Sequence, residues 1–232
     1  MSPDTPEALA PSVGLAVLHL FVKPSAGGAD AAAVAAAVKR AEGDGDQVVP
    51  VALLGHKADA AFMVLSEDVV RLRRFQTDVQ AAGLVVVDSY VSLTELSEYA
   101  QGLPPERNQA RLHPVLPPEG KRAWCFYPMS KRRNVGANWF TLPYDERKDL
   151  MYEHGASGRK FAGRVVQVVT GSTGLDDFEW GVTLFAEAPD DLKEVVYTMR
   201  FDEASALYGE FGAFYTGYTT SVEDLGAVLA AR

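Results

Sequence analysis

The strongest constraint on the fold is an order of predicted strands and helices that occurs twice along the chain. Val13–Val22 is apolar and rich in β-formers, as expected for a strand that is buried on nearly both faces. Ala31–Arg40 is dense in alanine and ends in basic residues, which favours a helix. The other elements predicted in the first half are strands at Gln47–Leu54, Ala60–Leu65 and Leu84–Val91, and a helix from a Ser66 cap to Ala82. The order is β-α-β-β-α-β.

The second half repeats this order without visible sequence identity. Ala123–Tyr127 predicts a strand, and Pro143 begins a helix that we expect to end at about His154, with Gly155 as its C-terminal cap. Strands at Phe161–Thr170, Phe178–Glu187 and Ala213–Tyr218 and a helix from Pro189 to Met199 complete it. The fold class is therefore α+β, with two tandem ferredoxin-like units at 13–100 and 123–232 and a proline-rich connecting segment at 101–122.

Composition and charge exclude several classes of protein. The chain has 232 residues, 47% of them hydrophobic, but no uncharged apolar run long enough for a membrane helix. Asp4 and Glu7 stand where a signal peptide would be basic, and a lone Cys125 cannot form an internal disulfide, so we expect a cytoplasmic protein. A net charge of −9 argues against general nucleic-acid binding. A local anion site is still predicted by a basic cluster of Lys121, Arg122, Lys131, Arg132 and Arg133.

Several polar and aromatic residues of the second half allow both a structural and a functional interpretation. At the end of its predicted helix, His154 either interacts with the helix dipole or serves as a single axial iron ligand. Trp139 and Trp180 either belong to the core or wall a large flat cofactor. In the apolar run VVQVV, Gln167 is either a structural amide or a pocket amide. GxGxxG, P-loop, GxSxG and HExxH motifs are absent from the sequence.

Long strings in the second half identify a family. They are CFYPMSKRR (Cys125–Arg133), His154-Gly155, GRKFAGRVVQ (Gly158–Gln167), GSTGLDDFEWGVTLF (Gly171–Phe185) and MRFDEASALYGEF (Met199–Phe211). These strings resemble the coproheme decarboxylases, which are dimeric α+β barrels of the chlorite-dismutase-like superfamily. The resemblance implies a pair of fused ferredoxin-like units and a ring of five subunits, a homopentamer.

The resemblance also implies a reaction and a set of site residues. Fe-coproporphyrin III (coproheme) is both substrate and redox cofactor, hydrogen peroxide oxidises its iron, and two propionates become vinyls to give haem b. His154 matches the proximal iron ligand, and Tyr127 matches the tyrosine whose radical removes hydrogen from a propionate side chain. The other matches are a pocket methionine, Met129, the distal glutamine, Gln167, the propionate contacts Arg111, Lys131 and Ser205, and two tryptophans beside the porphyrin, Trp139 and Trp180.

Two residues separate this reaction from its alternatives. Chlorite-degrading relatives have a distal arginine where this chain has the neutral Gln167, so we do not expect chlorite breakdown as the main activity. A porphyrin carrier would need His154 but no oxidisable Tyr127, and a haem peroxidase would retain its porphyrin unchanged. His113 is left without a role. The first half has no comparable set of polar residues, and we expect it to serve as scaffold and in assembly.

Overall fold

The computed structural model describes residues 7–100 and 104–230, so Asp4 and the start of the predicted connecting segment lie outside the described residues. The strands are β1 (Ala16–Pro24), β2 (Gln47–Leu53), β3 (Ala60–Ser66), β4 (Leu84–Thr94), β5 (Ala123–Lys131), β6 (Arg133–Asn134), β7 (Ala137–Asn138), β8 (Val165–Gly171), β9 (Trp180–Ala186), β10 (Gly209–Phe211) and β11 (Tyr215–Thr219). The helices are α1 (Ala31–Gly43), α2 (Val69–Ala81), α3 (Pro105–Leu112), the 3₁₀ turn η1 (Trp139–Thr141), α4 (Tyr144–Arg159), α5 (Pro189–Met199), α6 (Glu203–Ala206) and α7 (Val222–Ala230).

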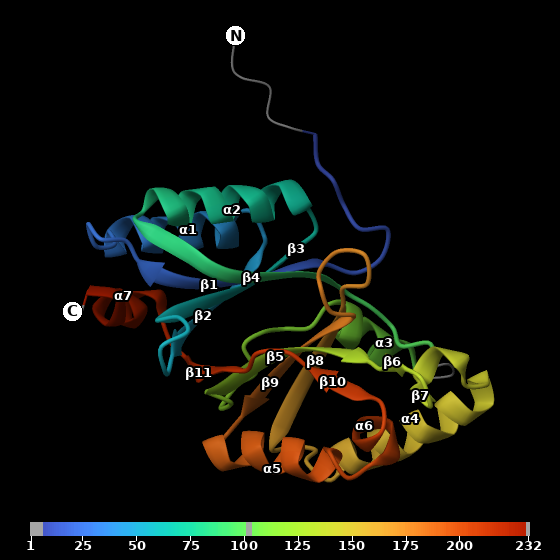
Figure 1. Ribbon diagram of the computed structural model, residues 1–232. Coiled ribbons are helices and arrows are strands. Elements are labelled where there is room, and N and C mark those ends of the chain that lie inside the picture. Colours follow the sequence, from blue (N-terminus) through green and yellow to red (C-terminus); the bar gives the residue numbers. More distant parts are fainter. Residues whose placement is uncertain (1–6, 101–103, 231–232) are drawn as a thin grey trace.

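Two four-stranded antiparallel sheets close on each other. The first has the order β4-β1-β3-β2 and the second β8-β9-β5-β11, which is the ferredoxin-like order in both cases. Hydrogen-bonded pairs between β2 and β11 and between β4 and β8 join the two sheets into a barrel. The predicted α+β class is confirmed, and Figure 1 shows the helices on the two outer sides of this barrel.

Alternation along each strand divides the core into an inner and two outer layers. On β1, Val17 and Phe21 point into the barrel, whereas Leu18 and Leu20 point out beneath α1 and α2. The barrel interior is fully packed and holds His19, whose Nε2 lies 3.0 Å from Oγ1 of Thr183. Burial lowers the pKa of His19 to about 3, which keeps its imidazole neutral.

Helix boundaries differ from the predictions at several points. The prediction that Gly155 ends the helix after Pro143 is wrong, because α4 continues through Gly155 to Arg159. Asp68, not Ser66, caps α2 with its carboxylate. The segment predicted to be irregular contains α3, which begins with Pro105 in its first turn. At the C-terminal end, α7 packs on α1 and β2 of the first sheet. None of the described helices is both long and apolar enough to cross a membrane.

Candidate functional site

A histidine and a carboxylate are paired at the junction of two helices. His154 lies on α4, and its Nδ1 is 3.0 Å from Oδ2 of Asp202 and 3.3 Å from Oγ of Ser205. Asp202 also caps α6 by accepting a hydrogen bond from the Ser205 backbone N–H. Burial raises the pKa of Asp202, but the hydrogen bond from His154 and its charge, together with the Ser205 donors, lower it to a net value below its ordinary range.

The pairing determines which imidazole nitrogen is available. An ionised carboxylate can only accept hydrogen bonds. Nδ1 of His154 is therefore protonated and donates the hydrogen bond that Asp202 accepts. In the neutral form of the imidazole Nε2 then has a free lone pair, and it makes no hydrogen bond to any residue in the described ranges. A carboxylate behind an imidazole is the common arrangement for a histidine that ligates a metal, because it fixes the tautomer and raises the basicity of the ligand.

Four of the predicted site residues share the outer face of the second sheet. Cys125, Tyr127 and Met129 alternate with the barrel-facing Trp124 and Phe126 along β5. Across β9, Tyr127 pairs with Val182 and Met129 with Trp180, while Gln167 of β8 pairs with Leu184. Strand spacing places β5 and β8 about 10 Å apart, so Tyr127 and Gln167 lie diagonally across β9. The structure therefore presents Tyr127, Met129, Gln167 and Trp180 on one surface.

Tyr127 lies in a mostly aromatic environment. Its ring stacks on Phe214 at a centroid distance of 4.5 Å and meets the edge of Phe211 at 5.8 Å. Only 6% of the residue is exposed, and this burial raises the pKa of its phenol. Tyr127 is thus a neutral phenol, which can give up its hydrogen as proton and electron together but cannot act as a phenolate at neutral pH.

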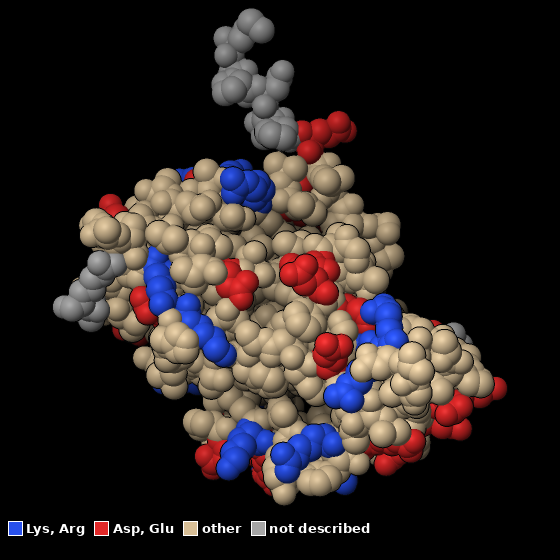
Figure 2. Space-filling model, viewed as in Figure 1, with Lys and Arg blue, Asp and Glu red and all other residues tan. Residues whose placement is uncertain are grey.

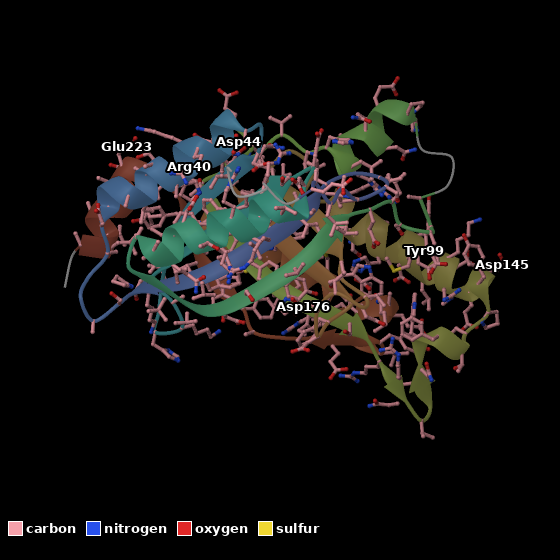
Figure 3. The ribbon with its side chains drawn as sticks, turned by 90° about the horizontal axis from the view of Figure 1, so that it is seen from above. Arg40, Asp44, Tyr99, Asp145, Asp176 and Glu223 are labelled. Carbon is pink, nitrogen blue, oxygen red and sulfur yellow. The ribbon has the colours of Figure 1, made fainter. Side chains whose placement is uncertain are left out.

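Lys131 and Trp139 form a separate contact at the end of β5. The ammonium Nζ of Lys131 donates to the carbonyl of Ala204 at 2.6 Å and sits 4.5 Å from the centre of the Trp139 ring. Trp139 is buried against Tyr208 and against the ring of Tyr99. Tyr99, labelled in Figure 3, also stacks on the ring of the first residue of α4. Burial lowers the pKa of Lys131 to about 8, although Asp202 and Glu179 act in the opposite direction. Lys131 therefore already has partners within the protein.

Two residues of the basic cluster are paired with acidic side chains. Lys121 binds Glu187, and Arg133 binds Glu179 while lying over the Phe140 ring. Arg111, on α3, is exposed and has no ion pair within the described part of the chain, so the structure does not bring it into contact with the other predicted residues. Figure 2 shows basic side chains over α5 and beside the β6–β7 hairpin, on the half of the molecule that carries His154.

The layer between α4 and the second sheet is open. Among the sixteen residues of α4 none is buried, even though the helix carries Leu150 and Met151. On the opposing sheet face Gln167 is exposed and Val169 is 41% exposed. A helix in a globular protein ordinarily buries one face. An imidazole with a free Nε2, and a sheet face exposed at Gln167 and Val169, fit a flat, largely apolar molecule that carries one metal with a position for a histidine ligand.

Fold and site together define a closed barrel of two ferredoxin-like sheets that carries a carboxylate-backed histidine on one outer side. The chlorite dismutase family profile matches residues 28–220, and the chain belongs to this family. It is 45% identical to the coproheme decarboxylase of Staphylococcus carnosus (strain TM300) over 183 residues, which cover 75% of this chain and 73% of the relative. It is 43% identical to the coproheme decarboxylase of Staphylococcus saprophyticus over 188 residues, with 77% and 75% covered.

Solved structures show the same fold. A heme-binding protein from Thermus thermophilus superposes with a TM-score of 0.82 at 35% identity, covering 97% of this chain and all of that chain. A mutant chlorite dismutase from Candidatus Nitrospira defluvii superposes with a TM-score of 0.78 at 18% identity, covering 95% and 98%. The second likeness supports the fold alone.

Sequence reasoning missed Asp202 as a functional residue. It lies within the string MRFDEASALYGEF, but an aspartate at a helix N-cap has an ordinary structural explanation. Only the folded chain shows that the same carboxylate reaches His154, which is 48 residues earlier.

Proposed function

We propose that this protein decarboxylates coproheme, converting two propionates to vinyls and yielding haem b, with hydrogen peroxide as oxidant. The observation that carries the proposal is the Asp202–His154 pair on the helix layer, which leaves Nε2 free, together with Tyr127 and Gln167 on the outer face of the second sheet. The chain's similarity to two coproheme decarboxylases over three quarters of its length supports the substrate.

His154 would hold the iron, and the outer face of the second sheet would cover the opposite side of the porphyrin. When bound, the iron porphyrin supplies the redox centre that peroxide oxidises. Gln167 is neutral and exposed on that face, so its amide can orient peroxide without adding a charge. Lys131, Arg111 and Ser205 remain candidates for propionate contacts. In the structure Lys131 binds Ala204, and Ser205 lies against His154.

Tyr127 would perform the step that separates an enzyme from a carrier. Its phenol would give a hydrogen atom to the oxidant that peroxide supplies and then take one from a propionate carbon. The carboxylate would leave as carbon dioxide, the remaining electron would pass to the same oxidant, and a vinyl would remain. For each propionate the balance is R–CH₂CH₂–COO⁻ + H₂O₂ + H⁺ → R–CH=CH₂ + CO₂ + 2 H₂O. The aromatic packing of Tyr127 by Phe211 and Phe214 keeps the ring in place without a competing proton acceptor.

The family resemblance further supports iron as the bound metal, a homopentamer and a cytoplasmic location as parts of this proposal. Sedimentation velocity of the purified protein tests the assembly directly. A species of five chains is expected, and a monomer or dimer would contradict the assembly without bearing on the chemistry.

The decisive experiment is mass spectrometry of the bound porphyrin during peroxide titration of the wild-type protein and of Tyr127→Phe. Wild type should lose two carboxyl groups in succession, whereas Tyr127→Phe should bind coproheme and form product at least about a hundredfold more slowly, as is typical when a chemically acting group is removed. Unchanged coproheme in the wild type would show a carrier, and haem turnover without carboxyl loss would show a peroxidase. A wild-type yield from Tyr127→Phe would overturn the role of Tyr127.

A further inference from the structure

A carboxylate of the first sheet reaches across the barrel seam to the porphyrin side of the second. Glu95 follows the last residue of β4, and its Oε1 accepts a hydrogen bond from the indole Nε1–H of Trp180 at 3.1 Å. Trp180 begins β9 and pairs with Met129 on the outer face that also presents Tyr127. The first half of the chain, predicted to serve as scaffold and in assembly, therefore touches a residue of the candidate site.

The approach of this carboxylate depends on a glycine. Gly171, the last residue of β8, pairs with Leu93 across the seam and with Trp180 in the hairpin. A Cβ atom at position 171 would lie 2.1 Å from Oε2 of Glu95 and 2.4 Å from its Cδ, which is closer than side-chain carbons approach. Any larger residue at this position would displace the Glu95 carboxylate from the indole.

Glu95 is exposed to solvent on one side and adjoins a mainly apolar hollow on the other. A surface hollow at this seam is lined mainly by apolar side chains, including Leu93, Leu96, Leu112 and Leu175. Burial in this setting raises the pKa of Glu95, and the hydrogen bond from Trp180 opposes the rise. The hairpin that carries Trp180 is also anchored to β4 by Asp176, labelled in Figure 3, whose Oδ2 accepts from the Val91 backbone N–H at 2.8 Å.

We infer that Glu95 is a positioning residue that fixes the orientation of the Trp180 indole at the rim of the porphyrin site. The inference rests on the proposed function for the identity of the ligand. Because the only hydrogen-bond donor of the indole is used by Glu95, Trp180 presents an aromatic surface to the porphyrin and cannot donate to a propionate. Glu95 thus sets both the angle and the chemistry of one wall of the site from the opposite sheet.

The first part of the test uses porphyrin-free protein. The chain has three tryptophans, so a nitrogen–proton NMR spectrum contains three indole signals, and Trp180→Phe identifies the one from Trp180. Glu95→Ala should shift that signal and speed its hydrogen exchange, while Glu95→Gln, which keeps an acceptor oxygen, should restore both. The matched control is Glu223→Ala. Glu223 lies on α7, and its carboxylate forms a surface ion pair with Lys39 of α1. An unchanged Trp180 signal in Glu95→Ala would overturn the inference.

The second part measures coproheme itself. Glu95→Ala should weaken coproheme binding and raise its KM about three- to tenfold, with kcat within about twofold and with rescue by Glu95→Gln, because only a wall of the site is loosened. Trp180→Phe should weaken binding similarly, and Glu95→Ala should add nothing in the Trp180→Phe background. Additive losses, or no rescue by glutamine, would contradict the positioning role. Failure of the wild type to decarboxylate coproheme would instead refute the proposed function, and the indole and binding measurements would still stand.

Discussion

The first helix of each ferredoxin-like sheet occupies the same place in the topology, yet the two helices pack differently. α1 buries Val34, Ala37, Val38 and Ala41 against the first sheet, whereas no residue of α4 is buried. Their strands differ in the same way. Both β1 and β5 have nine residues, and both fifth residues are buried, but the residue is the aliphatic Leu20 on β1 and the phenol Tyr127 on β5. One topology therefore forms a sealed core on one side and carries the proposed binding site on the other.

The difference lies in the side chains and not in the backbone plan. The outer positions of β1 and β3 that face α1, α2 and α7 are buried and, apart from Phe62, small or aliphatic. The corresponding face of the second sheet carries a phenol, an amide, a thioether and an indole, and its helix layer carries a histidine backed by a carboxylate. A repeated fold thus leaves one copy free to specialise when the other supplies enough buried apolar surface.

The largest difference in stability between the two sides is expected when a buried side chain is shortened on the first, sealed side. Leu20→Ala should lower the free energy of unfolding by about 2–5 kcal/mol, the usual cost of a cavity left by a buried leucine. Val169→Ala, on the open face, should cost less than about 1 kcal/mol because its side chain already contacts solvent. Urea unfolding of the porphyrin-free proteins measures both. Equal losses would mean that the second face is as tightly packed as the first.

Much of the scaffold is predictable because it follows local rules. The helix predicted from Pro189 to Met199 agrees with α5, since proline at its first turn and apolar spacing act within one segment. The end of α4 was not predictable in this way. A glycine often marks the end of a helix. Gly155 instead keeps helical geometry, at a cost of about 1 kcal/mol relative to alanine. Tertiary contacts with α5 and α6 outweigh that local preference.

The site was predictable in part for a related reason. Alternation along a strand places Tyr127 and Met129 on one face of β5, which the sequence shows directly. Which residues approach from distant segments depends on how the sheets close, so the Asp202 contact to His154 and the Glu95 contact to Trp180 required the structure. For the same reason the predicted propionate role of Lys131 stays a prediction, because its ammonium group binds Ala204 in the folded chain.

A smaller effect is expected when the helix layer of the open side loses its carboxylate. Asp202→Asn keeps a good cap for α6 and should leave stability nearly unchanged. The imidazole of His154 becomes less basic, so iron-porphyrin affinity should fall about 10- to 100-fold, as for other metal-ligand histidines that lose such a partner. Titration of ferric coproheme, followed by absorption, measures this. Asp191→Asn on α5, which pairs with Arg164, is the matched control and should bind normally.

The smallest effect is expected for Lys131, and it is measured as the pH dependence of coproheme affinity. Burial lowers the pKa of Lys131 to about 8, so its ammonium charge is present below that pH and is lost as the pH rises through it. If Lys131 leaves Ala204 to bind a propionate, coproheme affinity should fall as pH rises above 8 in the wild type, but not in Lys131→Met. A charge-assisted hydrogen bond is worth about 1.5–3 kcal/mol. Lys131 must give up its contacts with the Ala204 carbonyl and the Trp139 ring to make it, which offsets part of this energy, so we expect less than about a tenfold change in affinity.

Haem b retains only two of the four propionates, and parallel titrations with it separate contact with a reacting propionate from contact with a retained one. A pH profile identical in wild type and Lys131→Met would assign Lys131 to the support of α6 alone.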